Sequence, residues 1–268
     1  MVLGRQPSER AFPHGALRAA ALLSLALLAA APVAADLKIV AVTEVDGLGQ
    51  SGEGETVTVI RGLKSRSESR LGRTESVSLL DLDAREMTLL NARKKRAEVY
   101  DLSAMAQQQA GLETQKIQLE PTGNTREAAG FSCEDHRLDM SVEAGMEGME
   151  MTVVIGGTVC LSKDAPGGEE YAAFYQAMAE RGLFFGNPEA AEAQPGRERG
   201  MTELYRKLSE SGVALITDLN IGFEGGGLMA AMMKRMKLDM KTTVTSISEE
   251  SAAADAFAVP DGYRVKKK

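Results

Sequence analysis

The sequence predicts a mainly β protein, with about eleven antiparallel strands that curl into a barrel or half-barrel and two short helices late in the chain. Beyond residue 35, apolar and polar residues mostly alternate with period two, which is typical of strands with one buried face. The gaps between strand candidates are short enough for hairpins, so consecutive strands are expected to be antiparallel. Eleven such strands are many for an open flat sheet, and this favours curling.

Residues 1–35 have the order of a secretory signal peptide. An apolar run at 19–31 follows a basic segment and ends before the small residues Val33 and Ala35. The run is shorter than the roughly 20 apolar residues that span a bilayer. We therefore expect cleavage after Ala35, a periplasmic location and no transmembrane anchor in the mature chain. The basic segment contains Arg5, Arg10 and Arg18.

The mature chain is acidic. Residues 1–35 carry three basic residues and one acidic residue, so 28 basic and 37 acidic residues remain, a formal net charge of −9. This balance argues against nucleic acid, whose binding depends on neutralising phosphates. It also argues against an anionic membrane surface as the main partner, although residues 266–268 form a short basic end. The length of 36–268 suits one large domain or two small ones, and we expect a single β domain.

The first half of the mature chain reads as a series of strands. The alternating run 36–46 breaks at a glycine-rich loop, and further strand candidates follow at 55–62 and 63–71. Three short strands are then expected within 75–102, separated by 83–85 and 91–95, which have the length of hairpin loops. Steps this short predict an antiparallel meander, because a parallel return needs a long crossover.

The second half begins with a polar segment at 104–115, read as a helical turn, and a strand at 116–121. Residues 131–162 read as a long hairpin that folds at Gly145 to Gly148. Folding there places Cys133 directly opposite Cys160, close enough for a disulfide bond. Because both cysteines lie in the exported part and their number is even, we predict that they are bridged.

Two amphipathic helices interrupt the strands, at 166–182 and 200–212, with a polar surface loop at 187–200 between them. Strands resume at 213–223 and 236–248, and residues 257–268 are expected to form a tail. The apolar helix faces contain Tyr171, Phe174, Tyr175 and Met178 in the first helix and Met201, Leu204, Tyr205 and Leu208 in the second.

These patterns carry a resemblance. The strand order of "TVTVIRGLKSR", "SVSLLDLDAREMTLLNARKKRAEVYDL", the cysteine hairpin and the ending "FAVPDGYRV" resembles a family of exported bacterial proteins of unknown function. That family is itself similar to the lipoprotein carriers of the LolA and LolB type. The resemblance implies a curved antiparallel half-barrel whose two helices cover a concave, apolar face. It brings no catalytic motif, and no local motif places the arginine that the carriers use on a lipoprotein.

Two motifs have plain structural interpretations. Residues 47–52 match the glycine pattern of dinucleotide sites, but a strand follows where such a site needs a helix, so we expect a hairpin loop. His136, the one histidine after residue 35, is expected to be an ordinary strand residue. No acid–base pair, nucleophile motif or imidazole cluster stands out, so we expect neither an enzyme nor a cofactor, catalytic residue or metal site.

The methionine-rich stretch 225–247 has three readings: core filling, an adaptable wall for a lipid-like ligand, or thioether ligands for copper(I). The second reading, combined with the helix faces, predicts a cavity for a hydrophobic ligand. Its expected lining residues are Met229, Met232, Met233, Met236, Met240, Tyr171, Phe174, Met178, Leu204 and Tyr205.

Three functional classes follow. The first is a binding or carrier module for a hydrophobic group, with a lipid or a lipid-modified protein as partner. The second is a structural or assembly factor of the cell envelope that acts through protein contacts. The third is a protein that handles a soft metal through its methionines. The sequence favours the first of these.

Overall fold

The computed structural model describes residues 35–47, 50–72, 74–103, 117–143, 151–183, 195–226 and 237–268. The first strands are β1 (Asp36–Gly47), β2 (Gln50–Arg61), β3 (Lys64–Leu71), β4 (Thr74–Asp81), β5 (Glu86–Asn91) and β6 (Arg96–Asp101). The later elements are β7 (Ile117–Ala128), β8 (Phe131–Glu143), β9 (Met151–Ser162), α2 (Gly168–Glu180), α4 (Pro195–Ser211), β10 (Val213–Gly225), β11 (Leu238–Glu250) and β12 (Arg264–Lys267).

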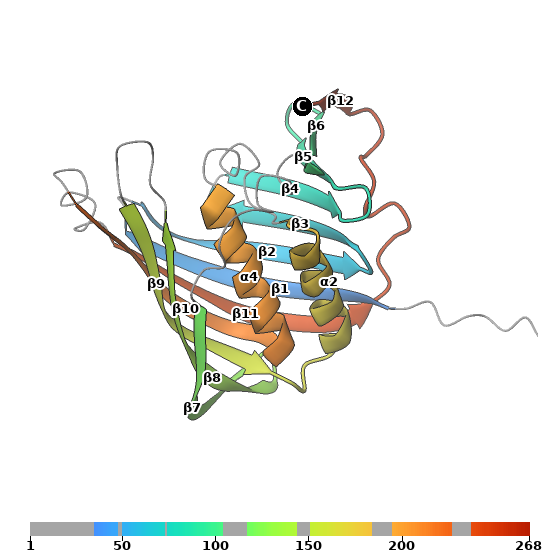
Figure 1. Ribbon diagram of the computed structural model, residues 1–268. Helices are drawn as coiled ribbons and strands as arrows, with labels where there is room; N and C mark the ends of the chain where they lie inside the picture. Colours follow the sequence, from blue (N-terminus) through green and yellow to red (C-terminus); the bar gives the residue numbers. More distant parts are fainter. Residues whose placement is uncertain are drawn as a thin grey trace, which may run out of the picture. The chain divides into compact units, whose positions relative to one another are not determined.

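The described strands form one open sheet in the order β12-β6-β5-β4-β3-β2-β1-β11-β10-β9-β8-β7 (Figure 1). Strands β1 to β6 form one antiparallel meander, and strands β7 to β11 form a second one. Strand β1 joins the two, because it pairs with β2 on one side and with β11 on the other. The predicted fold class, mainly β with a large curved sheet and two short helices, is confirmed.

Both faces of β4 and β5 are buried. Leu79 and Leu80 follow one another on β4, so their side chains point to opposite faces. Leu80 packs in the cluster that contains Phe174 of α2, whereas Leu79 packs with Val259 and Tyr263 from the C-terminal part of the chain. The leucine pairs "LL" in β4 and β5 therefore indicate strands that are covered on both faces. A strand with one covered face would show strict alternation of apolar and polar residues.

The chain between β11 and β12 runs along the sheet to its far edge (Figure 1). Arg61 donates a hydrogen bond to the carbonyl oxygen of Ala252 at 2.9 Å, and its guanidinium lies 4.8 Å from the centre of the Phe257 ring. Arg66 donates to the carbonyl oxygen of Ala256 at 3.1 Å. These contacts hold the segment after β11 against the sheet. The segment then reaches β6 and ends beside it as β12.

Strand β12 corrects the prediction that residues 257–268 form a tail. It pairs with β6 in parallel, from Arg264 opposite Arg96 to Lys267 opposite Val99. The pairing is parallel because the chain arrives by a long crossover instead of a hairpin. Its sequence, "RVKK", has one apolar residue and no alternation, so local pattern does not reveal a strand.

Helix α4 also begins earlier than predicted. Residues 195–199, expected to lie in a surface loop, form its first turn. Pro195 is the first helical residue, a position where proline is favourable because its missing N–H would have no partner within the helix. Here the local composition predicted a loop, but the helix extends back to its proline.

Strands β8 and β9 form the predicted hairpin, with a register that differs from the expected one by two residues. Asp135 is the residue opposite Cys160, so Cys133 lies two positions further along the same face. The two cysteines still form the predicted disulfide, as diagonal neighbours with Cα atoms 5.3 Å apart. The glycines at which we expected the fold, 145–148, lie outside the described residues.

Helices α2 and α4 lie side by side across one face of the curved sheet (Figure 1). The buried face of α2 consists of the four predicted residues, Tyr171, Phe174, Tyr175 and Met178. Leu204 and Leu208 of α4 are buried against the strands β8 to β10. The expected amphipathic faces are therefore those that meet the sheet.

A buried carboxylate fastens the junction of β1, β2 and the end of β11. The side chain of Asp36 is 2% exposed and accepts two hydrogen bonds from Arg61, both at 2.6 Å, and one from the Ala252 amide at 2.6 Å. The bonds from Arg61 lower the pKa of Asp36 below its usual value, although burial acts in the opposite direction. The charged carboxylate therefore stabilises the fold at neutral pH, and this contribution is lost as the pH falls through the folded-state pKa.

Removal of Arg61 and removal of Asp36 should lower the free energy of unfolding by different amounts. Arg61→Met leaves the buried carboxylate with one amide donor, and we expect the free energy of unfolding to fall by about 3 kcal/mol. Asp36→Ala leaves a guanidinium that water can reach, and we expect a loss of about 1–2 kcal/mol. Urea unfolding at neutral pH measures both, and the difference between Arg61→Met and the parent should shrink in acid. The reverse order of the two variants would contradict this account.

The disulfide should contribute measurably to stability. Its cysteines are 27 residues apart, which corresponds to about 3–4 kcal/mol on the chain-entropy model. We expect Cys133→Ala combined with Cys160→Ala to lower the free energy of unfolding by that amount. Urea unfolding with and without a reductant is the measurement, because reduction should lower the stability of the parent and leave the variant unchanged. An equal response of both proteins to the reductant would show that the bond contributes nothing.

Candidate functional site

A cavity of 190 Å³ lies between the two helices and the sheet. The helices contribute six of its lining residues, and strands β1, β2, β8, β9, β10 and β11 contribute eleven. Most of these side chains are apolar, and among the described residues that line the cavity none carries a carboxylate, an amine, an imidazole or a thiol. The lining can therefore offer van der Waals contact and hydroxyl hydrogen bonds to a guest.

Three tyrosines form the helix side of the cavity. The rings of Tyr171 and Tyr175 on α2 have centroids 4.6 Å apart, and Tyr175 stacks on Tyr205 of α4 at 5.1 Å. The Tyr175–Tyr205 contact joins α2 to α4, since stacked aromatic pairs attract one another beyond their buried area. The helix side of the cavity therefore has a rigid aromatic wall.

Burial raises the pKa of all three tyrosines. For Tyr171, Tyr205 adds to the effect of burial, and a backbone hydrogen bond with Ala214 opposes it. For Tyr175, burial is the largest cause, followed by Tyr171 and Tyr205. For Tyr205, burial is the cause. The hydroxyl groups therefore remain neutral well above physiological pH.

The sheet side of the cavity combines large apolar residues with small residues and threonines. Ala41 of β1 and Ala214 of β10 lie there with Thr58, Thr217 and Thr242. Two of these hydroxyls already have partners on neighbouring strands: Thr242 with Thr43 at 2.9 Å and Thr58 with Ser67 at 3.0 Å. At Ala41 and Ala214 the sheet presents small side chains towards the helices, and the cavity lies between the two surfaces.

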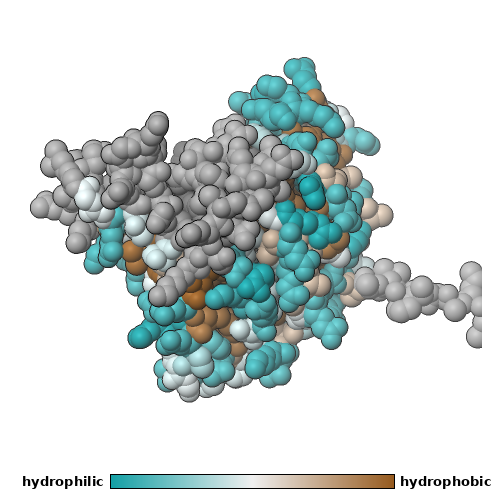
Figure 2. Space-filling view, viewed as in Figure 1, coloured by the Kyte–Doolittle hydropathy of each residue, from teal (hydrophilic) through white to brown (hydrophobic). Residues whose placement is uncertain are grey.

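The side chains that pack next to the cavity are apolar and largely buried. Figure 2 shows a group of hydrophobic residues where α4 lies over the strands β8 to β10, bordered by hydrophilic residues. The cluster of this region includes Ile117, Leu138, Met140, Ile155, Leu204, Leu208 and Leu219, with Met201 and Met240 partly buried against it.

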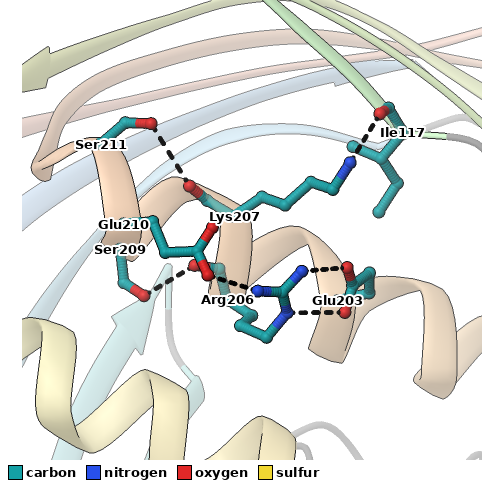
Figure 3. Close-up of polar contacts among 7 residues, drawn as sticks. All are labelled: Ile117, Glu203, Arg206, Lys207, Ser209, Glu210 and Ser211. Carbon is teal, nitrogen blue, oxygen red and sulfur yellow. Dashed lines mark hydrogen bonds and ion pairs between the residues drawn. The ribbon is translucent and has the colours of Figure 1, made fainter.

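Ion pairs within α4 join three of its side chains (Figure 3). Arg206 donates to both carboxylate oxygens of Glu203, at 2.9 and 2.5 Å, and also to Glu210. Three- and four-residue spacings bring these side chains together on one helix face. The hydrogen bonds that Arg206 donates to Glu203 are the main reason that the pKa of Arg206 is raised.

Lys207, the next residue, reaches outward from the helix. Its Nζ donates to the carbonyl oxygen of Ile117 at 3.0 Å, which ties α4 to the first residue of the edge strand β7 (Figure 3). The helix that carries Leu204 and Tyr205 is thus anchored to the sheet by a polar contact next to the apolar cluster.

The structure brings together some of the predicted ligand-lining residues. Tyr171, Leu204, Tyr205 and Met240 line the cavity. Phe174 and Met178 do not line it, because they are fully buried in the main core cluster. Met229, Met232, Met233 and Met236 lie outside the described residues, so their role stays a prediction.

Other lining residues escaped the sequence analysis. The sequence places Tyr175 on a buried helix face without linking it to the cavity, and it marks the threonines only as strand residues. Alternation shows that Thr58, Thr217 and Thr242 share a face with apolar neighbours. It does not show that this face is the one under the helices, because that depends on which strands lie side by side.

The remaining motifs are accounted for by strands. Gly47 ends β1 and pairs with Gln50 at the start of β2, so the glycine pattern at 47–52 belongs to a hairpin as predicted. Gly47 has φ of 126°, a conformation that favours glycine. His136 lies half-buried on β8, with Nδ1 3.0 Å from the carbonyl oxygen of Glu134. Among the described residues, no three His, Cys, Asp or Glu side chains are grouped so as to hold a metal.

Comparisons with known proteins add little to this picture. No protein-family profile and no curated protein matches the chain. A solved structure of PNGF-II in the C2 space group is similar over 88% of this chain, with 12% identity and a TM-score of 0.37. The matched part is 31% of the PNGF-II chain, and a likeness at this score carries no argument about the site. Within the described residues, no helix is both long and apolar enough to cross a membrane.

The cavity tyrosines predict an alkaline limit to stability. Because their pKa values are raised by burial, they stabilise the fold below the ordinary tyrosine pKa of about 10, and this contribution is lost as the pH rises through their folded-state values. We expect their ionisation, followed by ultraviolet absorbance after a pH jump, to occur only as the protein unfolds. Immediate ionisation of all five tyrosines in the folded protein would contradict the burial of this wall.

Proposed function

We propose that this protein is an exported binding module for a hydrophobic group, a lipid or lipid-like molecule. The observation that carries the proposal is the 190 Å³ cavity between the helices and the sheet, with its mainly apolar lining. A dry cavity of about 150 Å³ is large enough to take up benzene. The space is smaller than the roughly 300–1,000 Å³ of sites that enclose a whole drug-sized ligand. It therefore suits one ring or the end of an acyl chain.

The arrangement of the lining supports binding of a variable guest. Met201 and Met240 lie on opposite sides of the cavity, one on α4 and one on β11, and methionine adapts its shape to its neighbours. The tyrosine wall and the threonines add hydroxyl groups next to this adaptable surface. The guest's apolar end would lie among the methionines and leucines.

Export to the periplasm is part of the proposal. The signal-like order of residues 1–35 and the disulfide between Cys133 and Cys160 support it, because such bonds persist in oxidising compartments. The predicted cleavage after Ala35 would leave Asp36, the first residue of β1, at the start of the mature chain. The resemblance to lipoprotein carriers is in line with a periplasmic binding role.

Filling the cavity should block binding without unfolding the protein. Ala41→Leu places three further carbon atoms in the space, and we expect at least a tenfold weaker affinity for cis-parinaric acid, a fatty acid that fluoresces when bound in an apolar site. Stability should stay the same or rise, since the added atoms occupy empty volume. Fluorescence titration and urea unfolding provide the two measurements.

A matched control is Ala173→Leu, the same change at an exposed position of α2 outside the lining. It should bind like the parent. Leu219→Ala enlarges the cavity instead, so it should lower stability by about 2–5 kcal/mol and retain or strengthen uptake of the probe. If Ala41→Leu and Ala173→Leu bind the fatty acid equally well, the cavity is not the binding site.

A further inference from the structure

A strongly basic hollow lies at the β12 edge of the sheet, away from the cavity. Its volume is 810 Å³, and it lies between the β5–β6 hairpin and the residues that lead into β12. Five of its eight lining residues are cations and none is acidic. They are Lys94, Lys95, Arg96, Arg264 and Lys266, beside Gly262, Tyr263 and Val265.

The parallel pairing of β12 with β6 creates this hollow. It brings the segment "ARKKR" at 92–96 next to "YRVKKK" at 263–268, although more than 160 residues separate them in the chain. The amide of Arg264 donates to the carbonyl oxygen of Lys95 at 2.8 Å, which fixes the two segments to one another. Gly262, with φ of 80°, provides the turn that precedes β12.

Most of these cations make no ion pair with a described residue, although Glu98 stands opposite Lys266 in the strand register. Arg96 pairs with Glu98 at 3.0 Å. The side chains of Lys94, Lys95, Arg264 and Lys266 make no hydrogen bond or ion pair with any other described residue. Like charges gathered in this way repel one another, and here they do so in a chain whose formal net charge is −7. An anion bound in the hollow would relieve that repulsion.

We propose that the hollow binds a phosphate-bearing anion. Lysine and arginine side chains around a concave site are the groups that recognise phosphate, and the volume lies within the range of small-molecule sites. A lipid headgroup and a free phosphate compound offer this same chemistry. The inference stands apart from the proposed function, since no residue of the hollow lines the hydrophobic cavity.

The test separates the two sources of phosphate. Pyrophosphate is titrated into the full mature chain by calorimetry, and vesicles of phosphatidylglycerol mixed with phosphatidylcholine are tested by flotation. We expect binding in at least one arm, weaker at high salt because the cations are exposed. Saturable binding of pyrophosphate indicates a soluble ligand, whereas flotation with the anionic vesicles alone indicates a membrane headgroup.

Variants tie binding to the hollow. Lys95→Gln combined with Lys266→Gln should weaken binding by about tenfold or more. Each lysine near an anionic surface changes the affinity about fivefold. Lys163→Gln combined with Lys237→Gln removes the same charge from exposed positions elsewhere and should bind like the parent. Lysines on an edge strand such as β12 also discourage the pairing of that strand with the edge of another sheet. If the parent binds in neither arm, or if both double variants lose binding equally, the proposal is overturned.

Discussion

The pairing of β1 with β11 is the contact on which the rest of the sheet depends. Twelve residue pairs join these strands, and they unite two meanders that would otherwise be separate sheets with exposed inner edges. The partners lie about 200 residues apart in the chain, so the loop-closure entropy of this contact is offset only when both meanders are present. Asp36 secures the end of the junction, because its buried carboxylate binds β2 through Arg61 and the residues after β11 through Ala252.

The cavity follows from the packing of two unlike surfaces on this sheet. The helices bring tyrosine, leucine and methionine side chains, and the sheet sets Ala41, Ala214 and three threonines among larger apolar residues beneath them. Protein interiors are normally filled to the density of organic crystals, so a space between large and small side chains is a departure that a ligand can use. Lys207 ties α4 to the first residue of β7, and Arg206 with its two glutamates stabilises the helix itself.

The C-terminal part of the chain shapes the opposite end of the molecule. It covers the outer side of β4 and β5, where Leu79 and Leu90 pack with Val259 and Tyr263, and then adds β12 to the sheet edge. One crossing thus completes a small second core and assembles the basic hollow. The hydrophobic cavity and the basic hollow lie on different parts of one sheet.

Local pattern determined much of this structure, because it records which side chains are buried. Alternation located β1 to β11, the helix faces around Tyr171 and Leu204 were predicted, and the hairpin identified Cys133 as the partner of Cys160. Four predicted site residues line the cavity, while the methionines at 229–236 lie outside the described residues. Long-range packing decided the rest: the register of β8 on β9, the parallel β12, the threonines under the helices and the basic hollow. Each depends on strands meeting across the sheet, and period-two alternation is the same whichever strand lies alongside.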